Sequence, residues 1–512
     1  MTTEQNSKDL PDIEVGEDHV LAHNVDDEPV EANRRLFEGG LLKFVAMLAI
    51  AYSAFHLYSL NIAPLETWSF RIVHIAGALV LGFVLFAGAR FVSSEEGGAR
   101  HRWTTWISAG AMLPALYVLY QTFSFWQMVQ NGAMRIPAEL EVWHFGWPLL
   151  AATGAGIVMS WFHQRERSVF SVPDLVLIAC SLAVAAYFLV VYNTSMRMST
   201  GTSFAPVGIS FAAIAGTALI MELTRRVAGM ALVIIGLVFL AYVFAGPYLP
   251  GFLGYPGLSV QRFFSQVYTD AGILGPTTAV SSTYIILFII FAAFLQSSKV
   301  GDYFVNFAFA AAGRSRGGPA KVSIFASGLM GMINGTSAGN VVSTGSLTIP
   351  LMKKVGYSKQ SAGAVEAAAS TGGQIMPPIM GAGAFIMAEI TGIPYTEIAI
   401  AAIIPAILYF ASVYFMVDFE AAKTGMRGMR EDELPKLKTM MKQCYLFVPI
   451  IILIVALFMG YSVIRAGTLA TVSAAVVSWL SPNKMGLRQI LQALEIASYM
   501  AIQIIVVCAA AG

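Results

Sequence analysis

The chain has 512 residues, of which 57% are hydrophobic and only 12% are charged, and its net charge is +1. Soluble proteins carry about 25% charged residues, so this chain has too few polar groups to cover the surface of a soluble fold. The near-neutral balance also excludes a strongly basic nucleic-acid-binding protein. The composition therefore indicates a protein that crosses a membrane several times.

The first 40 residues differ in composition from the rest of the chain. They contain eleven acidic residues and three basic ones, and they lack an apolar repeat. This composition predicts a disordered, acidic, cytosolic tail over residues 1–40. The segment has no basic start of the kind found in signal peptides, so no cleaved leader is expected.

Apolar segments follow the tail, and most of them are long enough to cross a bilayer as helices. The eleven predicted spans are residues 44–62, 72–89, 103–120, 144–162, 175–192, 204–221, 227–245, 278–295, 398–416, 445–461 and 467–480. Lysine and arginine residues concentrate in alternate loops, which predicts a cytosolic amino terminus. By the same alternation, residues 421–442 are expected inside and residues 247–275 outside.

Residues 317–356 depart from the pattern of an ordinary span. Basic residues stand near both ends, and small polar residues gather in the middle. Two short helices joined by a polar break would form a re-entrant hairpin, because irregular backbone at membrane depth is tolerated only where protein or a cavity surrounds it. The residues expected at this break are Asn334, Gly335, Thr336, Ser337, Asn340 and Thr344. A glycine-rich packing seam is the alternative, although it does not explain the clustered amides and hydroxyls.

Residues 361–391 predict a discontinuous helix with a break at residues 371–378. Two glycines followed by two prolines cannot continue an ordinary helix. The break frees carbonyl groups at the end of one half-helix and N–H groups at the start of the next. The residues expected there are Ser370, Thr371, Gly372, Gly373, Ile375 and Pro377. A proline kink without a ligand is the alternative, and Glu366 fits either a structural hydrogen-bonding role or a role in ion coupling.

Two stretches carry a resemblance to a known family. GLMGMINGTSAGNVVSTGSLTIPLMKK, followed by AVEAAASTGGQIMPPIMGAGAFIMAE, closely resembles the large membrane subunit of TRAP (tripartite ATP-independent periplasmic) transporters. The form with extra amino-terminal spans looks like the fused permeases of the TAXI branch. By this resemblance, residues 41–168 are similar to a four-helix small subunit, residues 169–200 to a fusion helix, and residues 201–512 to the large subunit.

The resemblance implies an elevator-type secondary transporter in the bacterial inner membrane, built from inverted repeats. A periplasmic substrate-binding protein would deliver a small organic acid, with sodium as the coupling ion and no other cofactor. Ser337, Gly373, Ile375 and Pro377 would hold the sodium. Because the chain ends within an apolar segment, the second repeat is expected to be incomplete and the chain truncated.

The residues also leave room for other function classes. Ser337 lies in a G-x-S-x-G pattern typical of serine hydrolases, but that pattern needs a preceding strand and a nearby base. Pro319 stands where an ATP-binding P-loop needs lysine. An ion channel could also use a re-entrant loop. We therefore expect a transporter and no enzyme, with Thr336, Ser337 and Asn340 facing the 371–378 break across a sodium ion.

Overall fold

The computed structural model describes residues 33–89, 91, 102–163, 167–191, 200, 205–431 and 434–512. Within these residues every regular element is a helix, apart from an isolated backbone bridge between Arg34 and Phe86. Nine of the described helices are long and apolar enough to cross a bilayer. The predicted all-helical, multi-pass membrane fold is therefore confirmed, whereas most of the predicted tail lies outside the described residues.

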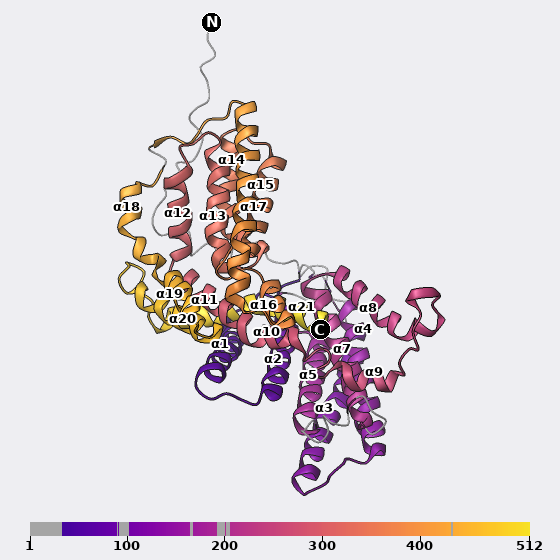
Figure 1. Ribbon diagram of the computed structural model, residues 1–512. Coiled ribbons are helices and arrows are strands. Elements are labelled where there is room, and N and C mark those ends of the chain that lie inside the picture. The colour runs from indigo at the N-terminus through magenta and orange to yellow at the C-terminus, as the bar shows by residue number, and fades with distance from the viewer. Residues whose placement is uncertain are drawn as a thin grey trace. The chain divides into compact units, whose positions relative to one another are not determined.

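The first five numbered α-helices belong to the amino-terminal part of the chain (Figure 1). They are α1 (Gly39–Asn61), α2 (Thr67–Leu85), α3 (Arg102–Gln130), α4 (Trp147–Phe162) and α5 (Val172–Val191), with a π-helical turn η1 (Leu140–Gly146) leading into α4.

A second group of helices runs from residue 207 to residue 312. It comprises α7 (Val207–Val227), α8 (Met230–Ala245), the short turns η2 (Gly246–Tyr248) and η3 (Gly251–Leu253), α9 (Val260–Val267), α10 (Pro276–Val280), η4 (Ser281–Ile285), α11 (Ile286–Ser297) and α12 (Val300–Ala312). α10, η4 and α11 form one continuous apolar segment.

The remaining helices extend to the end of the chain. They are α13 (Gly318–Asn334), α14 (Ser337–Lys354), α15 (Lys359–Gly372), η5 (Gly373–Ile375), α16 (Ala382–Thr391), α17 (Tyr395–Lys423), α18 (Leu437–Lys442), η7 (Cys444–Phe447), α19 (Val448–Phe458), α20 (Val463–Ser478) and α21 (Leu487–Ala511).

Eight of the eleven predicted spans coincide with long apolar helices. The other three are also helical, but α3 is more polar than those eight, and α19 and α20 are shorter. The sequence prediction missed α21 as a span, although it has 25 residues and a mean hydropathy of 1.9. The apolar segment expected at the end of the chain belongs to this helix, which carries Arg488 and Glu495 nearer its start.

Small side chains bring the helices of the main core close together. α21 packs against α1, α2, α7 and α11, and its buried positions include Ala493, Ala497 and Ala501. α7 buries a similar row that includes Ala212 and Ala215. Alanine lets helix backbones approach closely, which favours association in lipid, where no hydrophobic effect drives helices together.

A buried charge network joins α5 and α7 to the segment before α1. The Asp174 carboxylate accepts hydrogen bonds from Arg35 and, at 2.6 Å, from Arg226. Arg226 also donates through Nε to Glu222 at 2.8 Å, and Arg35 donates to the carbonyls of Phe83 and Val84 at the end of α2. Positive and negative groups thus pair inside the protein, which lowers the cost of burying them, and Arg226 Nη2 is the one nitrogen of that guanidinium without a hydrogen-bond partner among the described residues.

A histidine pair ties α1 and α2 to η4. His56 Nδ1 lies 2.8 Å from the carbonyl of Tyr52, so this nitrogen carries a proton and donates. In the neutral ring the other nitrogen, Nε2, then accepts from His74 Nδ1 at 2.8 Å. His74 Nε2 in turn accepts from the Ser281 hydroxyl at 3.0 Å. The buried pair therefore forms a directed chain of hydrogen bonds between the amino-terminal helices and the segment containing η4.

Candidate functional site

The predicted hairpin forms two antiparallel helices, α13 and α14, joined by a turn of two residues. Gly335 ends α13 with a left-handed φ of 61°, which glycine adopts without steric cost, and Thr336 is extended. α14 then begins at Ser337. The break is therefore shorter than the predicted stretch that reached Asn340, because a single left-handed glycine is enough to reverse the chain.

The discontinuous helix is also present, with its break later than predicted. α15 continues to Gly372 and passes into the 3-10 turn η5, so Thr371 and Gly372 remain helical. The irregular backbone lies at residues 376–381, before α16 begins. Tyr395 of α17 donates its hydroxyl to the carbonyls of Pro378 and Ile379 there. One tyrosine thus satisfies two carbonyls that the break leaves without helical partners.

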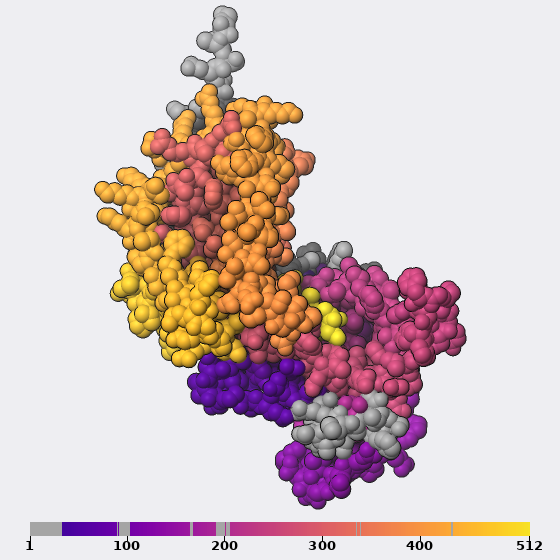
Figure 2. Space-filling model, in the orientation of Figure 1, coloured from indigo at the N-terminus to yellow at the C-terminus, as the bar shows by residue number. Residues whose placement is uncertain are grey.

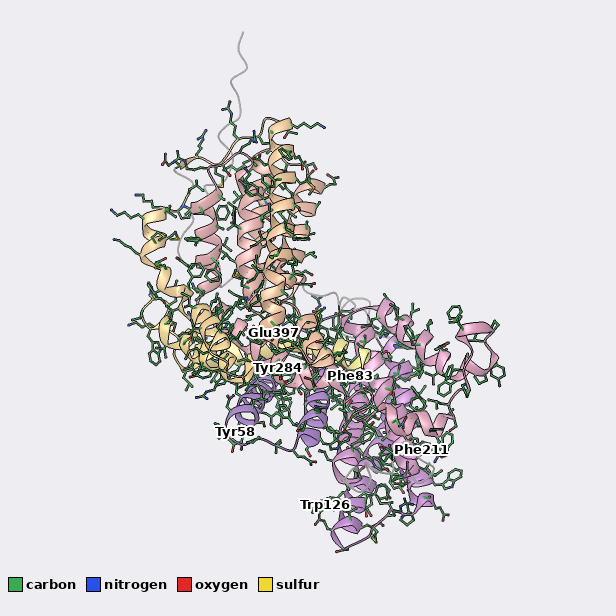
Figure 3. All side chains as sticks on the ribbon, in the orientation of Figure 1. Tyr58, Phe83, Trp126, Phe211, Tyr284 and Glu397 are labelled. Carbon is green, nitrogen blue, oxygen red and sulfur yellow. The ribbon has the colours of Figure 1, made fainter. Side chains whose placement is uncertain are left out.

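These two irregular segments lie in one bundle with α17. α13 packs against α14, α15 and α17, and the four helices run side by side (Figure 1). α17 is largely exposed, and its surface covers one side of the bundle (Figure 2). At the end where α16 lies, Phe385 stacks on Tyr395 with a centroid separation of 4.3 Å and contacts Tyr284, labelled in Figure 3.

The hairpin tip contacts the break at backbone distance. A Cβ atom added to Gly335 would lie 2.5 Å from the carbonyl oxygen of Met380, and one added to Gly331 would lie 2.3 Å from the Cα of Gly373. Ser337 accepts a hydrogen bond from Gln374 Nε2 at 3.2 Å. The close approach explains why glycine occupies both sides of the contact, since any side chain would force the segments apart.

Asn340 carries a buried polar atom without a partner. Its Nδ2 donates to the carbonyl of Ser327 at 2.8 Å and lies 3.5 Å from that of Ser370, which fixes the orientation of the amide. Its Oδ1 is buried and accepts no hydrogen bond from the described residues. An unpaired buried acceptor costs about 1–3 kcal/mol. A donor or a cation at this position would remove that cost.

The Glu366 carboxylate lies in the middle of the same bundle and is fully buried. Its Oε1 accepts from Thr344, from Ser370 at 3.2 Å and from Ser327 at 3.4 Å. Its Oε2 accepts from Ser323 at 2.7 Å and from Thr348. All five hydroxyl-bearing side chains are themselves buried. We call this set of five the hydroxyl cage.

The structure brings some of the predicted site residues together and leaves others apart. Asn340, Thr344, Ser370 and Gly373 come together in the bundle centre, and Thr336 and Ser337 lie partly buried at the hairpin tip. Thr371 and Ile375 are exposed, and the hydroxyl of Thr371 donates to the carbonyl of Ala367. Gly372 packs against the ring of Tyr409. Pro377 is partly buried at the break, and the side chain of Asn334 lies outside the described residues.

Sequence reasoning missed Ser323, Ser327 and Thr348 as members of this centre. The signal was present as helical spacing, because Ser323 and Ser327 are four residues apart, as are Thr344 and Thr348. Two hydroxyls four residues apart point from one face of a helix. Without the packing of three helices, nothing indicated that both pairs would face Glu366.

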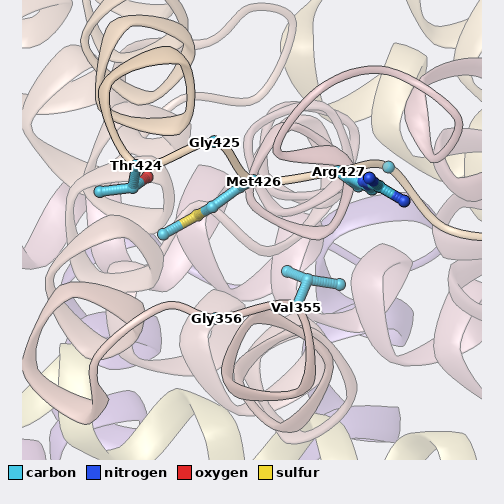
Figure 4. A pocket seen from close by; sticks show the side chains of 7 residues that line it. Val355, Gly356, Thr424, Gly425, Met426 and Arg427 are labelled. Carbon is cyan, nitrogen blue, oxygen red and sulfur yellow. The ribbon is translucent and has the colours of Figure 1, made fainter.

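The opposite end of the bundle is basic and contains a separate cavity. Lys321 and Arg316 both contact Asp418 at 2.6 Å. A cavity of about 340 Å³ lies between the α14–α15 turn and the chain after α17 (Figure 4). Its lining residues are Val355, Gly356, Thr424, Gly425, Met426, Arg427 and Gly428. By the course of the helices, this cavity is remote from the hairpin tip and is not the predicted ion site.

Comparisons with known proteins identify the carboxy-terminal part of the chain. Residues 215–512 match the family described as tripartite ATP-independent periplasmic transporter, DctM component. The C4-dicarboxylate TRAP transporter large permease protein DctM of Vibrio cholerae is 37% identical over 91 residues, which are 18% of this chain and 20% of that protein. The protein of the same name from Rhodobacter capsulatus is 30% identical over 151 residues, which are 29% of this chain and 34% of that protein.

A third relative, the uncharacterized protein y4mL of Sinorhizobium fredii, is 25% identical over 138 residues, which are 27% of this chain and 32% of that protein. The chain matches between a fifth and about a third of the length of these curated relatives. The family match itself covers more than half of the 512 residues. The chain therefore belongs to the DctM-component family of TRAP transporters.

Proposed function

We propose that this chain is the permease of a sodium-driven tripartite transporter, which imports a small organic acid delivered by a periplasmic substrate-binding protein. The names of two relatives make C4-dicarboxylates the first substrates to test. The observation that carries the sodium part is the buried, unpartnered Oδ1 of Asn340, a residue whose amide nitrogen lies against Gly373. This oxygen supports a bound cation, because a cation would satisfy an acceptor that the protein leaves free.

The surrounding groups suit a hard cation such as sodium. Such an ion prefers several oxygen ligands from carbonyls and hydroxyls. The hairpin tip and the break offer both kinds, with the Ser337 hydroxyl on one side and the backbone of residues 373–377 on the other. We therefore keep Ser337, Gly373, Ile375 and Pro377 as proposed sodium ligands and add Asn340 Oδ1.

We further propose that residues 41–168 act as a fused small subunit and that the protein belongs to the TAXI branch. α1 to α5 precede the region that matches the DctM family, and several of them pack directly on it. We place the protein in the bacterial inner membrane with a cytosolic amino terminus. The cluster of Arg316, Lys321, Lys353 and Lys354 at one end of the bundle supports this orientation.

Uptake by proteoliposomes tests the proposed function. The full-length permease should accumulate labelled dicarboxylate only when an inward sodium gradient and its substrate-binding protein are both present, and internal ATP should have no effect. Uptake without the binding protein, or uptake that depends on ATP, would contradict the proposal. A gradient of protons that replaces sodium completely would contradict the sodium part alone.

Replacement of Asn340 by alanine tests the ion site. Loss of Oδ1 should raise the sodium concentration for half-maximal uptake by a factor that corresponds to about 1–3 kcal/mol. Ser337→Ala should have a smaller effect, because this hydroxyl is only partly buried. Asn306 of α12 is exposed, and Asn306→Ala serves as the matched control. An unchanged sodium dependence in Asn340→Ala would refute the assignment.

A further inference from the structure

The hydroxyl cage surrounds a carboxylate that no positive side chain balances among its described partners. The donors to Glu366 come from three helices: Ser323 and Ser327 from α13, Thr344 and Thr348 from α14, and Ser370 from α15 itself. None of them is charged. Both carboxylate oxygens accept hydrogen bonds from hydroxyls, so all the donors around this side chain are neutral.

Hydroxyl dipoles stabilise a buried carboxylate only in part. They replace hydrogen bonds that water would supply, but they leave the net charge in a region of low dielectric constant. A buried charge normally persists in a protein only with an opposite charge nearby. The buried Glu366 carboxylate therefore needs a positive charge nearby, and its described partners do not provide one.

The Asn340 side chain and the Glu366 carboxylate contact the same two residues. Ser327 and Ser370 connect the two groups, because each donates its hydroxyl to Glu366 while its backbone carbonyl faces the amide of Asn340. The residue that carries the unpartnered acceptor and the carboxylate without a cation are thus linked through the same two serines. One bound cation would satisfy both needs.

We propose that Glu366 is the counter-charge of the cation site, a positioning residue that acts on the ion through the hydroxyl cage without ligating it. This inference rests on the proposed sodium-driven function. In this proposal the charge of Glu366 attracts the sodium ion. The backbone carbonyls at the break, the Ser337 hydroxyl and Asn340 Oδ1 contact the ion directly. The hydroxyls hold the carboxylate in place while the ion enters and leaves.

Replacement of the carboxylate by an amide separates this role from a merely structural one. Glu366→Gln retains the size and most hydrogen-bonding capacity of the side chain but removes its charge. The sodium concentration for half-maximal uptake should rise roughly tenfold or more, because the attraction of one unit charge at low dielectric constant is lost. The KM for the organic acid at saturating sodium should change less than threefold.

Three further variants complete the experiment. Glu366→Asp keeps the charge and should shift sodium dependence less than Glu366→Gln does. Ser323→Ala removes one cage hydroxyl and should raise the half-maximal sodium concentration by roughly two- to fivefold. Glu397→Gln makes the same change of charge at an exposed position in the first turn of α17 (Figure 3) and should have no effect.

The outcomes distinguish this inference from the proposed function. If wild-type uptake ignores sodium, the sodium part of the proposed function is wrong and the inference falls with it. If wild-type uptake needs sodium but Glu366→Gln lowers only the maximal rate, Glu366 is a structural residue and the inference alone is overturned. If Glu366→Gln does not fold, the comparison of Glu366→Asp and Ser323→Ala decides, and unchanged sodium dependence in both overturns the inference.

Discussion

Two regions of this molecule bury carboxylates and surround them with different partners. Between α5 and α7, Asp174 and Glu222 contact arginine side chains. In the hairpin bundle, the partners of Glu366 are hydroxyls alone. The first region balances its charges internally and needs no ligand. In the second region, the cation that we propose would supply the balancing charge.

The comparison predicts that the arginine network carries more of the stability than the hydroxyl cage does. Arg226 is fully buried and contacts both Asp174 and Glu222. Arg226→Ala would leave these carboxylates with too little positive charge, and breaking a buried pair in this way costs about 3–5 kcal/mol. Thermal unfolding of the purified protein in detergent measures this loss.

The matched control for Arg226 is its neighbour. Arg225 contacts Glu222 as well, but its side chain is 23% exposed. Arg225→Ala should therefore cost clearly less stability than Arg226→Ala. If Glu366→Gln destabilised the protein as strongly as Arg226→Ala, the cage would be a structural network of the same kind and the distinction between the two regions would fail.

Disruption of the close backbone contact between Gly331 and Gly373 should have the next largest effect on stability. A side chain on Gly373 would meet Asn340 Nδ2 and the Cα of Gly331, each at 2.8 Å. Gly373→Val should therefore cost about 1–3 kcal/mol in stability and abolish sodium-dependent uptake, because it separates the two irregular segments. Gly363 on α15 has no neighbour within 4 Å of an added Cβ, so Gly363→Val is the control. Equal loss of uptake in both variants would count against the contact.

The bundle centre was partly predictable because its signals are local in sequence. Glycines and prolines at residues 372–378 indicate a broken helix, and the Gly335 turn separates two helical stretches. These signals placed Asn340, Thr344 and Ser370 in one expected site. Exact break positions did not follow from them, because helix packing and the hydrogen bonds of Tyr395 decide where the backbone leaves the helix.

The arginine network was not predictable in the same way. Arg35, Asp174 and Arg226 are far apart in the sequence, and each alone resembles an ordinary charged residue at the end of a span. Only the packing of α2, α5 and α7 brings them into contact. The same reason explains why the cage around Glu366 was missed, although its hydroxyl pairs have helical spacing.

A third carboxylate, that of Asp302, extends the comparison, because its effect on stability should depend on pH. Asp302 lies in the first turn of α12, outside the spanning segments, and burial raises the pKa of its carboxyl from 3.8 to about 6, with Lys299 partly opposing the shift.

A raised pKa in the folded state means that the folded protein binds the proton more tightly than the unfolded chain. The contribution of this group to stability is therefore complete below pH 4 and is lost as the pH rises through 6. Asp302→Asn removes the ionisation, so the variant should match the wild type near pH 4 and exceed its free energy of unfolding at pH 8 by at most about 3 kcal/mol, because each pKa unit corresponds to about 1.4 kcal/mol. Unfolding measured across this range tests the expectation. A difference that stays constant between pH 4 and pH 8 would show that the charge of Asp302 is not responsible.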